Sequence, residues 1–389
     1  MIRKMVRKEL LNLARPSHGG EVWKHNTNLI DFSCSLNPLG PPSEIGEIIQ
    51  ENINNITHYP DDQCTNLIST ISDHLNIPQE YIIVGCGSTE LIKVFAETFI
   101  KPDDHIVVCS PTYDEYAFYC KFMGGAVNKL HLRESEDFKI ETDSLINQFN
   151  GSTKAVFLCN PNNPTSRYEN KKKILEIVEE CESRNILVFI DEAFIDFLKE
   201  GRSGSCVPDV QNYDNLFVSR SLTKIYSIPG IRVGYGVGGK EIIKYMNKAR
   251  LSWNVGVLDQ IVASELIQNC DSYIEKTVEF VESEKRNLYK QVSLIQGYEP
   301  VKPDVNFIFI KIEQLGIKST DFKNIMINKG FLIRDCVSFG DSFSNYIRIA
   351  VKNRDLNTLL LEALKTVSED MLSSSRSKFE TVEEPLSRF

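Results

Sequence analysis

Five short apolar runs occur in the middle of the chain, separated by polar segments with helical spacing. Each run is continuous rather than alternating, which is typical of strands covered on both faces, and alternation with helices favours a mostly parallel sheet. In the segment after the first run, Leu91, Val94 and Phe95 have near-helical spacing, so a helix is expected over residues 90–100. The pattern predicts the α/β fold class. The five runs are YIIVG (81–85), HIVVC (105–109), KAVFL (154–158), ILVFI (186–190) and NLFVS (215–219).

The last third of the chain has a different pattern. Residues 258–292 are amphipathic with helical spacing and predict a connecting helix. Beyond them, VNFIFIKI (305–312) and YIRIAV (346–351) flank a helical stretch, which predicts a smaller α+β unit. We therefore expect three parts, which are a large domain (45–257), a small domain (1–44 and 258–372) and a polar C-terminal tail (373–389).

Charge and composition narrow the classes of function. The formal net charge of −9 argues against nucleic-acid or anionic-membrane surfaces, so small molecules are the expected partners. The ten cysteines are scattered without a C-x-x-C pair, and the six histidines lack ligand spacing, so no metal is expected. No apolar run approaches the ~18 residues of a membrane span, and the basic N-terminus lacks a signal-peptide core. We expect a cytoplasmic protein with reduced thiols.

Unusual polar segments follow each of the five predicted strands. Ligands of open parallel sheets bind beyond the carboxyl ends of the strands, so these segments are expected to face one crevice. In the first segment, Gly87, Ser88 and Thr89 begin a helix and offer a phosphate cradle at its positive end; an ordinary helix N-cap is the structural alternative. The segments are CGSTE (86–90), SPTY (110–113), CNPNNPT (159–165), DEAF (191–194) and RSLTK (220–224).

Four further side chains extend this candidate site. Asp191 ends an apolar strand, where a carboxylate is poorly solvated unless it faces a cation or a protonated ring nitrogen; a helix cap is the alternative. Lys224 follows another buried strand, where a partly desolvated amine can form a Schiff base, although an exposed lysine is the ordinary case. Arg232 suits a phosphate, and Tyr113 is either a flat face for an aromatic ligand or a core tyrosine. Together with the cradle, they describe a pocket for pyridoxal 5′-phosphate.

A competing motif runs from Gly234 to Gly239. It satisfies the G-x-G-x-x-G pattern, and Asp259 follows about twenty residues later, as a dinucleotide site requires. However, these glycines fall inside an apparent strand rather than after one, so a nicotinamide site is not favoured.

Taken together, these segments resemble the fold-type I pyridoxal-phosphate enzymes of the class I/II aminotransferase superfamily. The resemblance implies a large domain with a mostly parallel sheet and a smaller α+β domain. It runs from about Ser17 to Val351 and includes YPD (59–61), GSTE (87–90), PTYDEY (111–116), NPNNPT (160–165), DEAF (191–194), SLTK (221–224) and GIRVGY (230–235).

The resemblance also implies roles for individual residues. Lys224 forms the Schiff base with the cofactor, Asp191 faces the pyridine nitrogen, and Tyr113 stacks on the ring. Asn163 binds the O3′ oxygen. Tyr59 reaches the phosphate from a neighbouring subunit, so a homodimer with a shared active site is expected. The remaining phosphate ligands implied are Gly87, Ser88, Thr89, Ser221, Thr223 and Arg232.

Two branches of the superfamily compete, histidinol-phosphate aminotransferase and L-threonine-O-3-phosphate decarboxylase. In the superfamily as a whole, Arg348 matches the arginine that binds the substrate carboxylate. Phe194, where aminotransferases commonly carry tyrosine, resembles the decarboxylase branch. The other features that resemble this branch are SHGGE (17–21) followed by DFSCSLNPLGPP (31–42), and LIRDCVSF (332–339).

A substrate phosphate has candidate ligands near both ends of the chain. His18, the amides of Gly19 and Gly20, and Arg334 supply donors for a dianion, although a solvated N-terminal histidine is the alternative for His18. Ser35 and Asn37 are expected near the substrate. Three positions depart from the family pattern, because asparagine is usual at 35 and common at 86 and glycine at 166, where this chain has Ser35, Cys86 and Ser166.

The sequence therefore predicts a pyridoxal-phosphate-dependent carboxy-lyase. Its expected substrate is an O-phosphorylated amino acid, threonine or serine, and its expected role is in cobamide (vitamin B12) biosynthesis. A histidinol-phosphate-type aminotransferase is the enzyme alternative. A non-catalytic protein that binds pyridoxal phosphate is the alternative from another class.

Overall fold

The computed structural model describes residues 1–25 and 28–380 of the chain. It contains two compact units. They differ in extent from the two domains predicted above, whose boundaries at residues 44 and 257 stay a prediction. Unit 1 consists of Met1–Ser17, Leu36–Glu282 and Asp304–Asn306, and unit 2 consists of His18–Ser35, Ser283–Pro303 and the residues from Phe307 onward.

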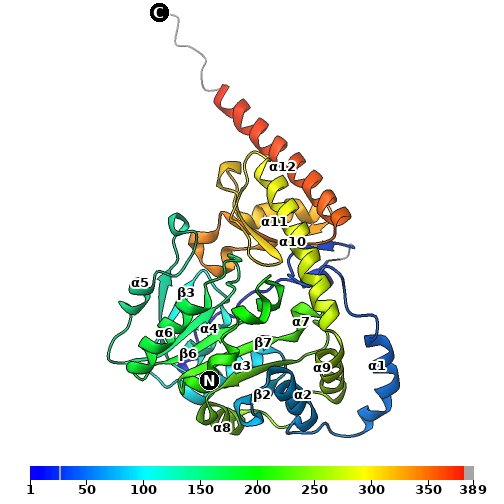
Figure 1. Cartoon of the computed structure of the whole chain (residues 1–389). Helices are drawn as coiled ribbons and strands as arrows, with labels where there is room; N and C mark the ends of the chain where they lie inside the picture. Colours follow the sequence, from blue (N-terminus) through cyan, green and yellow to red (C-terminus); the bar gives the residue numbers. More distant parts are fainter. Residues whose placement is uncertain (26–27, 381–389) are drawn as a thin grey trace, which may run out of the picture. The chain divides into compact units, whose positions relative to one another are not determined.

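A seven-stranded sheet forms the centre of unit 1 (Figure 1). Its strands are β2 (Ile82–Gly85), β3 (His105–Ser110), β4 (Ala126–His131), β5 (Thr153–Cys159), β6 (Leu187–Asp191), β7 (Leu216–Ser221) and β8 (Gly234–Gly238). The strand order is β2-β8-β7-β6-β5-β3-β4. The pairs from β7 through β4 are parallel, whereas β8 is antiparallel to both β7 and β2. This topology confirms the mostly parallel sheet and the α/β class predicted from the apolar runs.

One face of this sheet is packed with phenylalanine side chains. Phe157, Phe189 and Phe217 occupy matching positions on β5, β6 and β7, and neighbouring ring centroids are 5.1 and 5.2 Å apart. Phe95, which lies on α3 (Ser88–Phe99), contacts all three rings. All four side chains are fully buried, so their packing fixes the strands that lead to the candidate site.

The glycines of β8 make room for these rings. A Cβ atom added at Gly236 would lie 2.2 Å from the ring of Phe217, and one added at Gly238 would lie 2.8 Å from it. A Cβ at Gly234 would lie 2.7 Å from the backbone nitrogen of Ser88. A Cβ at Gly239, just after the strand, would lie 2.8 Å from the Asp214 carbonyl oxygen, so close packing at Gly234, Gly236 and Gly239 explains the G-x-G-x-x-G pattern.

We expect the Gly236→Ala variant to be less stable than the wild-type protein. The added methyl group overlaps a fully buried ring, and overpacking of this kind costs roughly 1–3 kcal/mol. Thermal unfolding measures the effect, with Gly230→Ala as a matched control because Gly230 is exposed and has open space at its Cβ position. If both variants unfold at the wild-type temperature, the proposed packing role of Gly236 is wrong.

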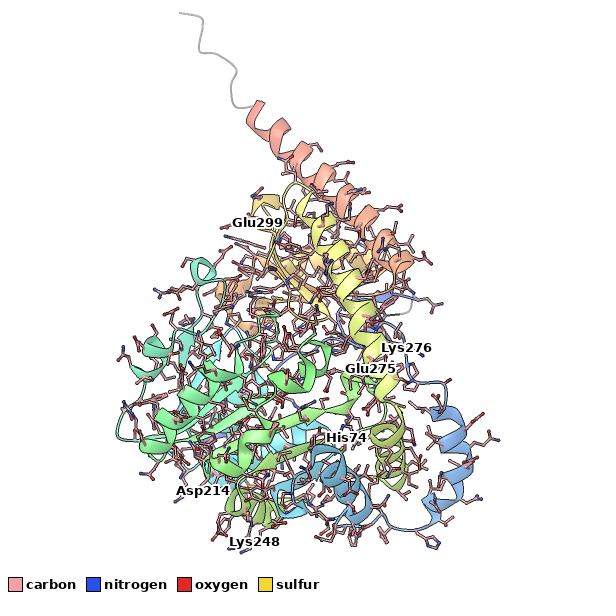
Figure 2. All side chains as sticks on the ribbon, in the orientation of Figure 1. His74, Asp214, Lys248, Glu275, Lys276 and Glu299 are labelled. Atoms are coloured by element: carbon pink, nitrogen blue, oxygen red, sulfur yellow. The ribbon has the colours of Figure 1, made fainter. Side chains whose placement is uncertain are left out.

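Helices of unit 1 cover the phenylalanine face. α3, α4 (Glu115–Phe122) and α8 (Lys240–Ala249) supply its buried apolar side chains, and α3 is the helix predicted over residues 90–100. α8 is amphipathic, because it buries Ile242 and Met246 and exposes Lys248 (Figure 2). The other helices are α1 (Ile45–Asn52), α2 (Thr65–Leu75), α5 (Thr142–Ile146), α6 (Lys171–Ser183), α7 (Leu222–Ile225), α9 (Val257–Asn269) and α10 (Asp271–Ser293), the last of which ends in unit 2.

Unit 2 is an α+β unit with two small sheets. A four-stranded antiparallel sheet has the order β12-β13-β10-β9, and β1 pairs in parallel with β11. The polar tail predicted from residue 373 begins as helix, since α12 continues to Glu380, and residues 381–389 lie outside the described residues. The elements are β1 (Ile30–Asp31), β9 (Glu299–Pro300), β10 (Phe307–Lys311), α11 (Ser319–Asn328), β11 (Phe331–Leu332), β12 (Arg334–Asp335), β13 (Tyr346–Ala350) and α12 (Arg354–Glu380).

Candidate active site

Hydrogen bonds join the loops that follow β3 and β5. The Thr112 hydroxyl donates to Oδ1 of Asn162 at 2.8 Å, and Nδ2 of Asn162 donates to the Pro111 carbonyl at 2.9 Å. Both side chains are buried. The contacts hold the segment that carries Asn163 against the segment that carries Tyr113, two residues predicted to bind the cofactor.

Asp191 lies at the carboxyl end of β6 and is 3% exposed. Its Oδ2 atom accepts a hydrogen bond from the Tyr116 hydroxyl at 2.7 Å, and its Oδ1 atom accepts one from the Ala193 backbone at 3.0 Å. Burial raises the pKa of Asp191, while the Tyr116 hydrogen bond and the Lys224 amine oppose the shift. A buried carboxylate in this setting suits a protonated ring nitrogen.

Tyr116 is a site residue that the sequence analysis missed. It is fully buried on α4, and its ring meets the Tyr113 ring edge-on, with centroids 5.7 Å apart. The hydroxyl groups of Tyr113 and Thr89 are 3.4 Å apart. The motif PTYDEY contains Tyr116, but its contact with Asp191 joins positions 75 residues apart and follows from the fold alone.

The predicted phosphate cradle is formed by Gly87, the start of α3 and Arg232. Gly87 has a φ of +75°, and a Cβ atom there would lie 2.6 Å from Nη2 of Arg232. A larger residue would therefore strain the backbone and displace the guanidinium. The first-turn N–H groups of α3, which include those of Ser88 and Thr89, lack partners within the helix. A guanidinium against the amino end of a helix suits a phosphate.

Further polar contacts surround this cradle. The hydroxyls of Ser221 and Thr223 are buried and 2.9 Å apart. At the departure Cys86, the backbone N–H donates to Oε2 of Glu90 at 2.6 Å, and the same oxygen accepts from Asn254 at 2.7 Å. Burial and the Glu90 carboxylate raise the pKa of the Cys86 thiol, so the thiol stays protonated at neutral pH. Glu90 thus anchors the loop backbone, a role the sequence analysis did not assign.

Lys224 lies on the short helix α7 and is half-buried. Asn37, which was predicted near the substrate, contacts the backbone of this helix. Its N–H donates to the Lys224 carbonyl at 3.0 Å, and its Nδ2 donates to the Ile225 carbonyl at 2.7 Å. The substrate-binding role of Asn37 stays a prediction.

Ser166 shows how the chain accommodates the absence of the usual glycine. It has a φ of +63°, in the left-handed region that favours glycine, and it is fully buried. Its N–H donates to the Asn162 carbonyl at 2.8 Å, and its hydroxyl accepts from the Val305 N–H at 3.1 Å. The serine hydroxyl therefore adds a contact that glycine would lack.

Two buried arginines lie side by side in unit 2. Arg334 on β12 pairs with Arg348 on the antiparallel strand β13, and both are less than 10% exposed. Burial and the neighbouring Arg334 lower the pKa of Arg348 to about 10. Nη2 of Arg334 donates to the Ser338 hydroxyl at 2.6 Å. Two adjacent guanidinium groups favour anionic ligands.

Ser33 contacts Arg348 within unit 2. Nη2 of Arg348 donates to the Ser33 carbonyl at 2.6 Å, and the Ser33 hydroxyl accepts from the Gly20 N–H at 2.8 Å. A Cβ atom at Gly19 would lie 2.5 Å from the Ser33 carbonyl oxygen. The structure thus brings Gly19 and Gly20 of the SHGGE segment next to Arg348 through Ser33, which the sequence analysis did not single out.

Three other predicted site residues differ in exposure. Ser35 is buried, whereas His18 is exposed. Tyr59 is 81% exposed, and its ring stacks on Trp253 with centroids 4.7 Å apart. In the described part of the chain, no helix is long and apolar enough to cross a membrane, and no side-chain cluster could hold a metal ion.

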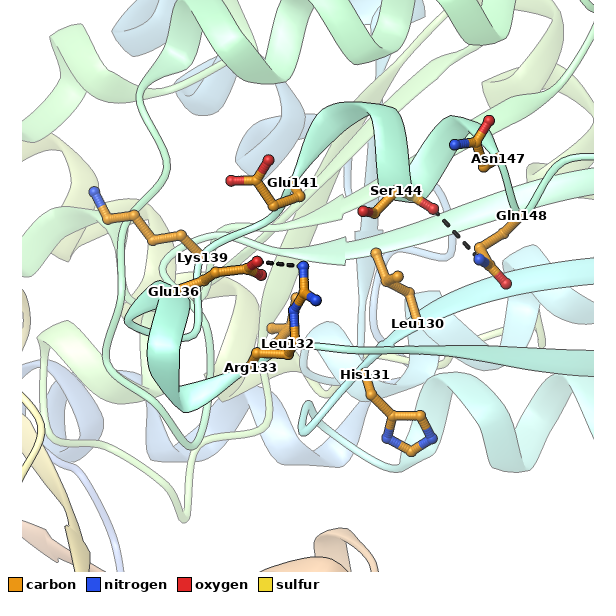
Figure 3. Close-up of a pocket in the computed structure, with 10 residues that line it drawn as sticks. All are labelled: Leu130, His131, Leu132, Arg133, Glu136, Lys139, Glu141, Ser144, Asn147 and Gln148. Carbon is orange, nitrogen blue, oxygen red and sulfur yellow. Dashed lines mark hydrogen bonds and ion pairs between the residues drawn. The ribbon is translucent and has the colours of Figure 1, made fainter.

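A surface groove of about 360 Å³ lies elsewhere in unit 1 (Figure 3). It is formed by the end of β4 and the segment leading into α5, with an ion pair between Arg133 and Glu136. None of the predicted site residues lines it, so this groove is separate from the candidate site.

The residues at the carboxyl edge of the sheet fit pyridoxal phosphate. Gly87 leaves the space at Arg232 that a Cβ atom would fill, which suits the phosphate. The buried carboxylate of Asp191 suits the ring nitrogen, and the half-buried amine of Lys224 suits Schiff-base formation.

Known proteins resemble this chain over most of its length. A family model described as aminotransferase class I and II matches residues 27–364. A protein of Caldanaerobacter subterraneus subsp. tengcongensis, named provisionally as a threonine-phosphate decarboxylase, is 36% identical and covers 91% of this chain and 94% of its own. A histidinol-phosphate aminotransferase of Moorella thermoacetica is 31% identical, covering 87% and 86%. The crystal structure of the histidinol-phosphate aminotransferase from Clostridium acetobutylicum superposes on this chain with a TM-score of 0.81. The two sequences are 29% identical, and the match covers 88% of this chain and 100% of the other.

Proposed function

The chain belongs to the class I and II aminotransferase family, whose enzymes depend on pyridoxal phosphate, and on this premise we propose that it decarboxylates an O-phosphorylated amino acid. With O-phospho-L-threonine the product is 1-aminopropan-2-yl phosphate, and with O-phospho-L-serine it is ethanolamine phosphate. The proposed pathway is cobamide biosynthesis, which the resemblance to the decarboxylase branch implies.

The observation that carries this proposal is the pair of buried arginines. A phosphorylated amino acid carries a carboxylate and a phosphate at once, and Arg348 and Arg334 offer one guanidinium to each. The SHGGE segment, which contacts Arg348 through Ser33, supplies further donors. Histidinol phosphate has a phosphate but no carboxylate, so it offers an anionic group to only one of these two guanidinium groups.

The residues of the site have separable tasks in this reaction. When bound, pyridoxal phosphate supplies an electron sink for the pair left at Cα. Asp191 favours a proton on the ring nitrogen because its buried charge is otherwise poorly compensated. Arg348 orients the carboxylate that leaves as CO₂. Nζ of Lys224 carries the proton that replaces the carboxylate at Cα.

An aminotransferase is the second candidate. The 31% identical relative and the 29% identical solved structure are both histidinol-phosphate aminotransferases, and the same Lys224 and Asp191 serve that reaction. The difference lies in which bond at Cα is broken, the bond to hydrogen or the bond to the carboxylate. Phe194, buried beside the site strand, lacks the phenol that aminotransferases commonly have there.

We also propose a homodimer in which Tyr59 contacts the cofactor phosphate of the second copy. Tyr59 and its stacking partner Trp253 are 81% and 52% exposed in the single chain. Large aromatic side chains with this exposure are enriched at interfaces. Sedimentation measurements of the mass in solution test this assembly.

Release of CO₂ tests the proposed reaction. The purified protein with pyridoxal phosphate is incubated in turn with O-phospho-L-threonine, O-phospho-L-serine and unphosphorylated threonine, and separately with histidinol phosphate plus 2-oxoglutarate. We expect CO₂ from a phosphorylated amino acid and little from threonine. Glutamate formation without any CO₂ would instead identify an aminotransferase. The ratio of the two phosphorylated substrates measures how Ser35 shapes the site.

A further inference from the structure

Asn37 is buried between α7 and α10. It is 2% exposed, and its Nδ2 donates to the Ile225 carbonyl and to the Thr277 hydroxyl, both at 2.7 Å. Its backbone N–H donates to the Lys224 carbonyl at 3.0 Å. Its Oδ1 accepts from the Leu39 N–H at 3.0 Å. Every polar group on the side chain is therefore engaged within the chain.

These contacts matter because α7 is only four residues long. Carbonyl groups at the end of a helix lack partners within it, and the last two carbonyls of α7 belong to Lys224 and Ile225. Asn37 supplies a donor to each of them. The Lys224 carbonyl also accepts from the Ser227 N–H at 3.3 Å, and its bond from Asn37 comes from the backbone, so the Asn37 side chain acts through the Ile225 carbonyl. A buried carbonyl that loses its donor costs free energy, so the Asn37 side chain fixes the end of the helix from which Lys224 extends.

The segment that carries Asn37 is itself held in place. The Leu36 carbonyl accepts from Nδ2 of Asn306 at 3.2 Å, and Asn306 is fully buried. On the other side, the Thr277 hydroxyl also donates to the Tyr273 carbonyl at 2.8 Å on α10. Asn37 is thus a rigid link between α7 and α10 rather than a freely moving side chain.

We propose that Asn37 is a positioning residue for Lys224 and not a direct ligand of the substrate. An asparagine amide has two N–H donors, and both are used here, so a bond from this nitrogen to the substrate requires the loss of an existing one. The proposal rests on the proposed function in one respect, that Lys224 binds pyridoxal phosphate.

Two substitutions at Asn37 test this role. Asn37→Asp keeps the shape but replaces the donors with a carboxylate beside the Ile225 carbonyl, and Asn37→Ala removes the group. The matched control is Asn215→Ala, which removes another buried amide that donates to two backbone carbonyls, those of Val178 and Ile186, at the start of β7 and away from Lys224. Each variant is measured without substrate, by pyridoxal-phosphate affinity and by the pH titration of the Schiff-base absorbance, and then by kcat and KM.

A positioning role predicts changes before any substrate is added. We expect both Asn37 variants to bind pyridoxal phosphate about 10-fold more weakly and to show a displaced pH midpoint. Their kcat should fall roughly 10- to 100-fold, with KM nearly unchanged, while Asn215→Ala keeps the wild-type cofactor affinity, titration and kcat. If Asn37→Ala does not fold, Asn37→Ser, which retains one donor, should lie between wild type and Asn37→Asp.

The opposite pattern would overturn the proposal. A raised KM with an unchanged substrate-free titration and cofactor affinity would make Asn37 a substrate ligand. No change in any measurement would also overturn it. Because the first two measurements use no substrate, they remain decisive even if the protein releases no CO₂ from phosphorylated amino acids.

Discussion

Replacing Lys224 by alanine is expected to abolish turnover while the chain still folds. The half-buried amine is the group that forms the Schiff base and moves the proton at Cα, so one substitution removes both functions. We expect kcat to fall by about 10³-fold or more. The visible absorbance of the bound cofactor, and its change on borohydride treatment, should be lost together with activity.

Lys240→Ala serves as the control for this variant. Lys240 is an exposed lysine at the start of α8, and its partner is the exposed Glu80 at 3.2 Å, so its loss should leave turnover and absorbance unchanged. Wild-type turnover in Lys224→Ala would refute a catalytic role for this lysine. A non-catalytic cofactor-binding protein would instead keep its biological effect in the variant.

The strands that carry the site could be predicted because they are buried on both faces. Each of the five continuous apolar runs overlaps one strand, and the run ILVFI ends at Ile190, one residue before β6 ends at Asp191. The edge strand β4 was not predicted. Its residues are half-exposed or exposed, and polar side chains such as Asn128 and Lys129 interrupt the apolar pattern. A strand whose side chains are partly exposed lacks the second covering layer that produces a continuous run, whereas the other edge strand, β2, is buried throughout and was predicted.

The contacts that position the site residues could not be predicted from local pattern. Tyr116 meets Asp191 across 75 positions, and Asn37 meets Ile225 across 188. A single sequence contains no local signal for such pairs, because the fold alone brings them together. Roles for the residues that perform chemistry could thus be assigned from the motifs, whereas Ser33 and Glu90 lie inside quoted motifs but their supporting contacts could not be predicted.

Asp191→Asn is expected to impair the holoenzyme without destabilising the apoprotein. Burial raises the pKa of the Asp191 carboxyl, because the charged form is less stable in the folded interior than in water. At neutral pH the charge therefore lowers the free energy of unfolding, and a neutral asparagine amide does not. The cofactor needs that charge, because it favours the proton on the ring nitrogen. We expect kcat to fall by about 10²-fold or more, with weaker cofactor binding, while the apoprotein unfolds at or above the wild-type temperature at neutral pH.

The comparison of the two apoproteins has a predictable pH dependence. The folded protein holds the proton of Asp191 to a higher pH than the unfolded chain does. The free-energy cost of burying the charged carboxylate is therefore absent below the ordinary pKa of aspartate and develops as the pH rises through the raised value. Wild type and Asp191→Asn should therefore unfold alike in acid and diverge toward neutral pH, with the variant more stable. Tyr116→Phe removes a hydrogen bond that favours the charged form, so in that background the divergence should start at the same pH, continue to higher pH and become larger. If Asp191→Asn is instead the less stable apoprotein at neutral pH, the charged carboxylate stabilises the fold. The idea that its burial destabilises the apoprotein is then wrong.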